Sequence, residues 1–98
     1  MSSFNERCYA ILMKVPRGKV TTYKALANAL GTKAYRAVGN AMNKNPYAPK
    51  VPCHRVIGSN GALVGFASGL EKKRKILERE GIKVDNGRVD LERYEFEF

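Results

Sequence analysis

Residues 22 to 43 read Thr-Tyr-Lys-Ala-Leu-Ala-Asn-Ala-Leu-Gly-Thr-Lys-Ala-Tyr-Arg-Ala-Val-Gly-Asn-Ala-Met-Asn. Threonine is a good N-terminal cap, so Thr22 predicts a helix that runs through Leu30. Gly31 suits the left-handed residue at which such a helix ends. Thr32 predicts the cap of a second helix, over about residues 33 to 43. Two short helices joined around a glycine predict a helix-turn-helix, whose second helix normally enters a DNA groove.

The second of these helices presents unusually small side chains on its surface. Ala37 and Ala41 are small, and Gly39 costs about 1 kcal/mol in a helix relative to alanine, so a close approach has to explain it. One interpretation is tight packing on another helix, and the other is close contact with a DNA backbone or a narrow groove. The glycine alone slightly favours packing.

The residues before this pair predict one more helix, from about residue 4 to residue 14. Ser3 and Glu6 have the spacing of a capping box. Apolar side chains recur at helical spacing and predict one buried face. They are Phe4, Cys8, Ile11, Leu12 and Val15. On that face Cys8 is most simply a small buried apolar residue.

Length and charge set the class of protein. The chain has 98 residues and a net charge of +9. This length predicts one domain, residues 1–98, and no apolar run approaches the roughly 20 residues that span a bilayer. Residues 85–98 carry −3, which leaves +12 on the first 84. So basic a segment favours nucleic acid as the partner, although solubility alone is the plainer explanation.

Further along, residues 51 to 56 read Val-Pro-Cys-His-Arg-Val and place the single histidine beside a cysteine. A thiolate needs a neighbouring base or positive charge to form near neutral pH, and His54 and Arg55 offer both. Pro52 and the β-branched residues around it predict a strand entered through a rigid loop. Side chains alternate along a strand, so Cys53 and His54 would exchange a proton through a water or after a local bend. That weakens the case for a cysteine-protease dyad.

Cys8 and Cys53 are the two cysteines of the chain. A small disulfide scaffold normally has more, so both are predicted to be free thiols. One histidine and no Cys-x-x-Cys spacing leave a zinc site without ligands, so no metal is expected.

The segment around Cys53 resembles the active-site signature of the O6-alkylguanine-DNA alkyltransferases, which read Pro-Cys-His-Arg-Val at the cysteine that accepts the alkyl group. Other segments resemble the family's motifs in order and spacing, so that the resemblance covers about residues 4–82. They are residues 20–27, 36–42, 45–46 and 80–81. The resemblance is to the C-terminal DNA-binding and active-site domain only, without the family's additional N-terminal domain. It implies a mainly α fold with small β elements around a winged-helix-like helix-turn-helix.

This resemblance implies DNA repair by irreversible transfer of an alkyl group from O6-alkylguanine in double-stranded DNA to Cys53. The protein would be a methylated-DNA–protein-cysteine S-methyltransferase that acts once per molecule, because a thioether has no easy route back to a thiol. The damaged base has to flip out, since its alkylated oxygen lies within the base pair. No cofactor and no membrane are implied. We expect a monomer in the cytoplasm, associated with the nucleoid, or in the nucleus of a eukaryote.

Catalytic roles follow from the same resemblance. Cys53, a water, His54 and Glu80 would form a relay that holds the cysteine as a thiolate. Tyr23 would donate a proton to guanine N3 as the base leaves. Asn45 lies eight residues before Cys53 and would support the active-site turn.

For DNA, the resemblance implies that the helix containing Gly39 enters the minor groove. Arg36, at the front of this helix, would fill the gap left by the extruded guanine, and a phosphate contact is the alternative. The predicted DNA-binding residues are Tyr23, Arg36, Ala37, Gly39 and Arg55, and the predicted lesion pocket is Tyr23, Val64, Phe66 and Ser68.

The loop predicted to cover the extruded base departs from the family pattern. The family commonly has tyrosine at Phe66, and serine followed by paired glycines at residues 67–69. Phe66 keeps an apolar wall without the hydroxyl, and Ala67 lacks a hydroxyl that could bond the guanine oxygen. The departure concerns rate and alkyl preference more than the reaction itself.

After this loop, Ser68 and Glu71 have capping-box spacing and predict a helix that stops at Gly81. Its basic run, Lys72 to Lys75, is typical of a solvated face. Residues 83–98 predict a hairpin-like tail, to which no function is assigned.

Two other functions stay open. The chain also resembles the alkyltransferase-like proteins, non-catalytic lesion binders that mark damage for another pathway and usually have tryptophan at the cysteine position. Cys53 argues against this interpretation, whereas Phe66 and Ala67 keep it open. A helix-turn-helix regulator of undamaged DNA is the second alternative, but it leaves the Cys-His-Arg cluster unexplained.

Overall fold

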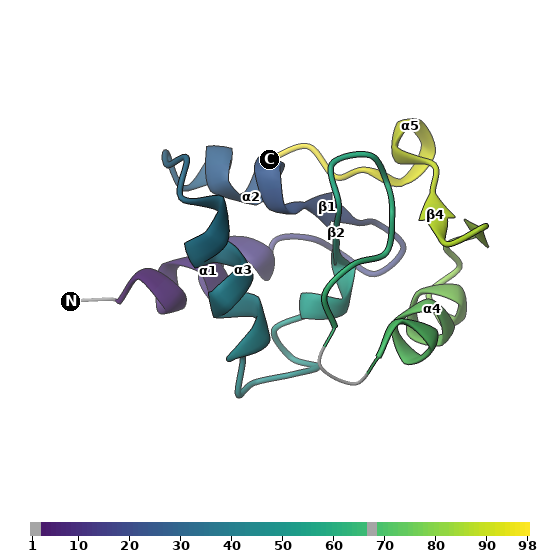
Figure 1. The fold of residues 1–98 in the computed structure, drawn as a ribbon, viewed down its shortest axis with the longest axis horizontal. Coiled ribbons are helices and arrows are strands. Elements are labelled where there is room, and N and C mark those ends of the chain that lie inside the picture. The colour runs from purple at the N-terminus through teal and green to yellow at the C-terminus, as the bar shows by residue number, and fades with distance from the viewer. Residues whose placement is uncertain (1–2, 67–68) are drawn as a thin grey trace.

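The computed structural model describes residues 3–66 and 69–98. Its elements in chain order are α1 (Phe4–Leu12), β1 (Thr21–Thr22), α2 (Tyr23–Ala29), α3 (Tyr35–Asn43), the 3₁₀ turn η1 (Cys53–Arg55), β2 (Val56–Ile57), α4 (Leu70–Arg79), β3 (Val84–Asp85), β4 (Arg88–Val89) and α5 (Leu91–Tyr94). Helices dominate and both sheets are two-stranded, which confirms the predicted mainly α class. Figure 1 shows α1, α2 and α3 gathered at one end of the elongated molecule and α4 at the other.

Helix α1 is the predicted N-terminal helix, and the predicted capping box holds its first turn. The Glu6 amide donates to Ser3 Oγ at 3.1 Å, and the Ser3 amide donates to the Glu6 carboxylate at 3.4 Å. Cys8 is fully buried, as predicted. Sequence reasoning missed Tyr9, whose hydroxyl donates to the Ala41 carbonyl at 2.9 Å and so joins α1 to α3.

The helix-turn-helix is formed by α2 and α3. The Ala25 amide donates to Thr22 Oγ1 at 3.0 Å, which confirms the predicted cap of α2. Gly31 has the expected left-handed backbone, with φ of +75°. The predicted cap of α3 was wrong, because α3 begins at Tyr35 with no capping side chain. The Thr32 hydroxyl instead accepts the Ala34 amide at 3.1 Å, a local turn that competes with helix capping.

A short parallel pair, β1 and β2, lies between two hydrophobic cores. Thr21 is opposite Val56 and Thr22 is opposite Ile57. Successive residues of a strand face opposite sides. Accordingly Val56 belongs to the core around α1, α2 and α3, whereas Ile57 belongs to the core that includes Leu77 of α4. The pair therefore joins the helix-turn-helix to the other half of the molecule.

The tail is built into this second half. It contains the antiparallel pair β3–β4, and it continues into α5 and a segment that bonds to Val20, the residue before β1. The Val20 amide donates to the Tyr94 carbonyl at 2.9 Å, and the Phe96 amide donates to the Val20 carbonyl at 2.7 Å. Gly61 makes close contact with β4, because a Cβ there would lie 2.4 Å from the Val89 carbonyl oxygen. The tail is thus a structural partner of the strands.

No helix of the described ranges is long and apolar enough to cross a membrane.

Candidate active site

Cys53 begins a 3₁₀ turn, not the strand that the β-branched residues predicted. The Cys53 amide donates to the Val51 carbonyl and the Arg55 amide donates to the Pro52 carbonyl, both at 2.9 Å. These short-range bonds close the turn, and strand pairing starts only at Val56. Successive side chains of a 3₁₀ turn lie about 120° apart, so the turn supplies the local bend that the sequence left open. The Cys53 side chain is half-buried, whereas His54 is buried.

Asn45 braces the segment that leads into this turn. Its side-chain amide donates to the Val51 carbonyl at 2.8 Å, and its side-chain oxygen accepts the Tyr47 amide at 2.9 Å. One side chain therefore closes a loop whose last residue, Val51, also bonds Cys53. This geometry agrees with a supporting role for Asn45.

A buried carboxylate, Glu80, joins the two residues that follow the cysteine. His54 Nε2 lies 3.0 Å from Glu80 Oε2. Arg55 Nε donates to Glu80 Oε1 at 2.9 Å and Arg55 Nη2 donates to Glu80 Oε2 at 2.8 Å. Glu80 is the C-terminal cap of α4 and its side chain is only 8% exposed. The end of α4 is thereby fixed against η1 by a two-pronged ion pair, which is stronger and more directional than a single contact.

Protonation follows from this geometry. Burial of Glu80 opposes its charge, but hydrogen bonds from Arg55 and His54 outweigh burial, so the pKa of Glu80 is lowered and it stays ionised. Burial lowers the pKa of His54 despite its bond to Glu80, so the ring is neutral at pH 7. A neutral ring that donates from Nε2 to a carboxylate leaves Nδ1 as an acceptor. His54 is thus a base ready to receive a proton.

Arg55, which was predicted to bind DNA, has its guanidinium bonded inside the protein. Its remaining guanidinium nitrogen, Nη1, donates to the Val15 carbonyl at 2.9 Å, and its side chain is 15% exposed. All three nitrogens of the group are therefore used inside the protein. We assign Arg55 to holding Glu80, and with it His54, in place.

Tyr23 begins α2 and faces the loop after β2. Its hydroxyl lies 3.4 Å from the Gly65 carbonyl, a long hydrogen bond that leaves the proton available to a better acceptor. Burial, followed by the nearby charge of Cys53, raises the pKa of Tyr23. The phenol therefore stays protonated at neutral pH, and it lies close enough to Cys53 to interact with its charge.

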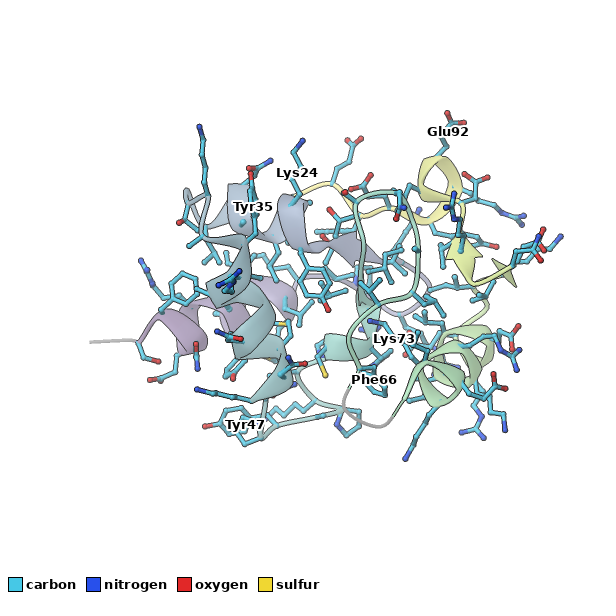
Figure 2. All side chains as sticks on the ribbon, viewed as in Figure 1. Lys24, Tyr35, Tyr47, Phe66, Lys73 and Glu92 are labelled. Carbon is cyan, nitrogen blue, oxygen red and sulfur yellow. The ribbon has the colours of Figure 1, made fainter. Side chains whose placement is uncertain are left out.

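Lys73 is the site residue that sequence reasoning missed. The run from Lys72 to Lys75 was predicted to be solvated; Lys72 and Lys75 are exposed, but Lys73 is 0% exposed. Its ammonium donates to the carbonyls of Val56 and Val64, at 2.5 and 2.8 Å. It also lies 5.8 Å from the centre of the Phe66 ring, beside which Figure 2 shows it. Lys73 therefore ties the strand after the cysteine to the loop that contains Val64 and Phe66.

Burial lowers the pKa of Lys73 to about 8, while the charge of Cys53 acts in the opposite direction. The Lys73 ammonium therefore lies close enough to Cys53 to interact with its charge. The signal for this residue in the sequence is helical spacing, because Lys73 lies one turn before the buried Leu77 and on its face.

Two of the predicted pocket residues, Val64 and Phe66, belong to the loop that Lys73 holds. Val64 is exposed and Phe66 is half-buried. The predicted pocket residue Ser68, and Ala67, lie outside the described residues. The predicted helix cap at Ser68 therefore also lies outside the described residues. The N-cap residue of α4 is Gly69.

The predicted DNA-binding residues of α3 line its outer side. Arg36 is exposed, and Ala37 and Gly39 are half-exposed. A Cβ placed on Gly39 would meet nothing within 4 Å. Packing on another helix, which the sequence slightly favoured, therefore does not explain this glycine.

Within the described part of the chain, no three His, Cys, Asp or Glu side chains are grouped to hold a metal ion.

Comparison with known proteins agrees with this geometry. Residues 3–82 match the family model described as "6-O-methylguanine DNA methyltransferase, DNA binding domain". The chain belongs to this family. Family membership confirms the resemblance predicted from the sequence, and the fold matches solved members.

Three similar proteins illustrate the relation. The methylated-DNA–protein-cysteine methyltransferase of Saccharolobus solfataricus is 52% identical over 73 residues, which are 74% of this chain and 47% of that protein. Mycobacterium tuberculosis OGT, solved in complex with DNA, matches 83% of this chain and 50% of its own with a TM-score of 0.78 and 41% identity. Schizosaccharomyces pombe Atl1, solved with damaged DNA containing O6-carboxymethylguanine, matches 100% of both chains with a TM-score of 0.86 and 29% identity.

The curated relatives are considerably longer than this chain. It spans 30% of the first and about half of the others. Family membership therefore covers the DNA-binding domain, residues 3–82.

Proposed function

We propose that the protein is a methyltransferase that repairs DNA by transferring an alkyl group from O6-alkylguanine to Cys53. Each molecule can perform this transfer once. The observation that carries the proposal is the buried arrangement of His54, Glu80 and Arg55 behind a half-buried Cys53. A regulator that only binds DNA has no use for a neutral histidine held by an ionised carboxylate beside a thiol. The cysteine transferases among the relatives support this assignment.

The reaction follows from the positions of the donors and acceptors. The Cys53 thiol gives its proton to His54 Nδ1 through a water, and the thiolate sulfur attacks the alkyl carbon in line with the bond to O6. A carbon–sulfur bond forms and the carbon–oxygen bond breaks, which leaves its electron pair on the guanine. The Tyr23 hydroxyl donates its proton to guanine N3 and later regains one from solvent, and the neutral base becomes ordinary guanine when its proton is exchanged from N3 to N1.

DNA binding is assigned to α3. We propose that α3 lies in the minor groove, where Ala37 and Gly39 allow close approach. Arg36 is exposed at the front of the helix and enters the base stack when the lesion flips out. The open space beside Gly39 supports this docking, because nothing inside the protein requires a glycine there. OGT and Atl1, which resemble this chain, were both solved with DNA, and this supports DNA as the partner.

One observation favours a second function. Atl1 matches this chain over the full length of both, including the tail that lies beyond the family match at residue 82. Atl1 was solved with damaged DNA containing O6-carboxymethylguanine, so lesion binding without transfer is the second candidate function. The intact cysteine, histidine and glutamate favour transfer, and the two functions differ in one measurable product.

The test is the intact mass of the protein after incubation with duplex DNA that contains O6-methylguanine. Transfer predicts the gain of one methyl group in place of hydrogen, located on Cys53 by peptide mapping and absent in Cys53→Ala. Cys8 is an internal control, because it is a fully buried thiol and should remain unmodified. An unchanged mass together with preferential binding to the damaged duplex would replace this proposal by lesion recognition.

A further inference from the structure

A hollow of about 420 Å³ lies beside the helix-turn-helix, and of its lining residues only Tyr23 has a role in the reaction described above. Tyr23, Lys24, Tyr35 and Ser59 line it. These residues come from the first turn of α2, the first residue of α3 and the turn after β2. Three segments far apart in the sequence therefore meet at the end of α3 that carries Arg36.

Tyr35 is the unusual member of this set. It is 43% exposed and is the first residue of α3, next to Arg36. Figure 2 shows Tyr35 beside Lys24, on the side of the helix-turn-helix away from Lys73 and Phe66. Burial of a tyrosine ring contributes strongly to binding, so an exposed ring at a binding surface favours contact with a partner.

The chemistry of the lining matches a nucleotide. It consists of a lysine, a serine hydroxyl and two phenols, with no acidic side chain among the described lining residues. Lysine and hydroxyl groups bind phosphate oxygens, and an aromatic face packs on a base or a sugar. The proposed path of DNA along α3 continues into this hollow, because Arg36 and Tyr35 are consecutive residues.

We infer that the hollow holds the nucleotide next to the extruded guanine in the damaged strand. The Tyr35 ring packs against its deoxyribose, and Lys24 contacts its phosphate. Tyr23 forms the wall between the two nucleotides, because it lines this hollow and its hydroxyl also faces the loop beside Cys53. Tyr35 thus fixes the position of the damaged strand during extrusion. This inference rests on the proposed docking of α3 in the minor groove.

The first experiment measures binding and not transfer, so that it can succeed or fail separately from the proposed reaction. In a Cys53→Ala background, Tyr35→Ala and Tyr35→Phe are titrated onto a fluorescein-labelled duplex that contains O6-methylguanine. Tyr35→Ala is expected to weaken binding about 5-fold or more, the lower end of what aromatic contact with a nucleotide contributes. Tyr35→Phe keeps the ring and is expected to stay within about 2-fold of the parent.

Tyr47→Ala is the matched control, because Tyr47 is also an exposed tyrosine, 54% exposed, and lies at the other end of α3 in Figure 2. Thermal melts of each variant show that it is folded. Equal affinity of Tyr35→Ala and Tyr47→Ala would overturn the inference. A loss in Tyr35→Phe as large as in Tyr35→Ala would also overturn it, since the hydroxyl and not the ring would then make the contact.

The second experiment locates the phosphate. Neutral methylphosphonates replace single phosphates on either side of the lesion, with and without Lys24→Gln. If Lys24 contacts a flanking phosphate, the two changes are not additive at that one position, and Lys24→Gln reduces the slope of log affinity against log salt by about 1. Additive effects at both flanking positions would refute the contact.

Discussion

The buried ammonium of Lys73 gives a prediction whose sign and size can be worked out. The ordinary pKa of lysine is 10.5, and burial lowers that of Lys73 to about 8 in the folded protein. Between these values the unfolded chain binds a proton that the folded protein does not, so stability rises with pH in this window. At pH 7 the protein bears the full cost of the buried charge. Between pH 7 and pH 9.5 about 2 kcal/mol of this cost is relieved.

The assay is urea unfolding at a series of pH values from 7 to 9.5, for the parent protein and for Lys73→Met. The methionine fills similar space without a charge, so its unfolding free energy should lack the rise of about 2 kcal/mol. Cysteine and tyrosine groups titrate in both proteins, and the difference between the two curves removes their contribution. Lys72→Met is the matched control, because Lys72 is the exposed neighbour on the same helix. Parallel curves for the parent and Lys73→Met would refute the reasoning.

Three further predictions concern Glu80, Gly39 and Gly61. Glu80→Gln should slow transfer at least tenfold in single-turnover assays, because His54 loses the carboxylate that orients it. The pKa of Glu80 is lowered in the fold, so the stability that its charge adds is present above pH 4.5 and is lost as the pH falls below that value. Acid unfolding of Glu80→Gln should lack this loss of stability. An acid transition identical to that of the parent would contradict the prediction. Gly39→Ala should stabilise the protein by about 1 kcal/mol in urea unfolding and yet weaken DNA binding, whereas unchanged affinity would remove α3 from the interface. Gly61→Ala should cost about 2 kcal/mol or more, since a Cβ there meets the Val89 carbonyl at 2.4 Å and the backbone φ is +85°; Gly87→Ala, with φ of +72° and open space, separates the clash from the backbone strain.

The sequence was sufficient to predict those features that depend on the type of a single residue. The family motifs identified Cys53, His54 and Glu80, and the structure brings the last two within hydrogen-bond distance. The turn at Gly31 was predictable for a similar reason, because few residues other than glycine adopt its backbone. Local chemistry and observed geometry agree at these positions.

Other features depend on which of several local bonds forms, or on contacts distant in sequence. Thr32 had two local partners for its hydroxyl, and the structure used the turn instead of the cap. Cys53 to Arg55 have β-branched neighbours, yet bonds to Val51 and Pro52 form a turn there. Lys73 looked solvated in a run of four basic residues, and only the carbonyls of Val56 and Val64 explain its burial. Arg55 has the charge of a DNA contact, but Glu80, 25 residues away, occupies it.

The bonds between Val20 and the tail have a consequence for how the protein is made. Val20 precedes β1, which pairs with β2 directly after the cysteine turn, and the carbonyl of Val20 is bonded only when the Phe96 amide is present. Residues 20 and 96 are far apart in the chain, so this closure has to wait until Phe96 has left the ribosome. During synthesis the nascent chain already contains Cys53 but lacks the strand that completes its scaffold. The scaffold around the proposed nucleophile is therefore complete only after Phe96 has emerged.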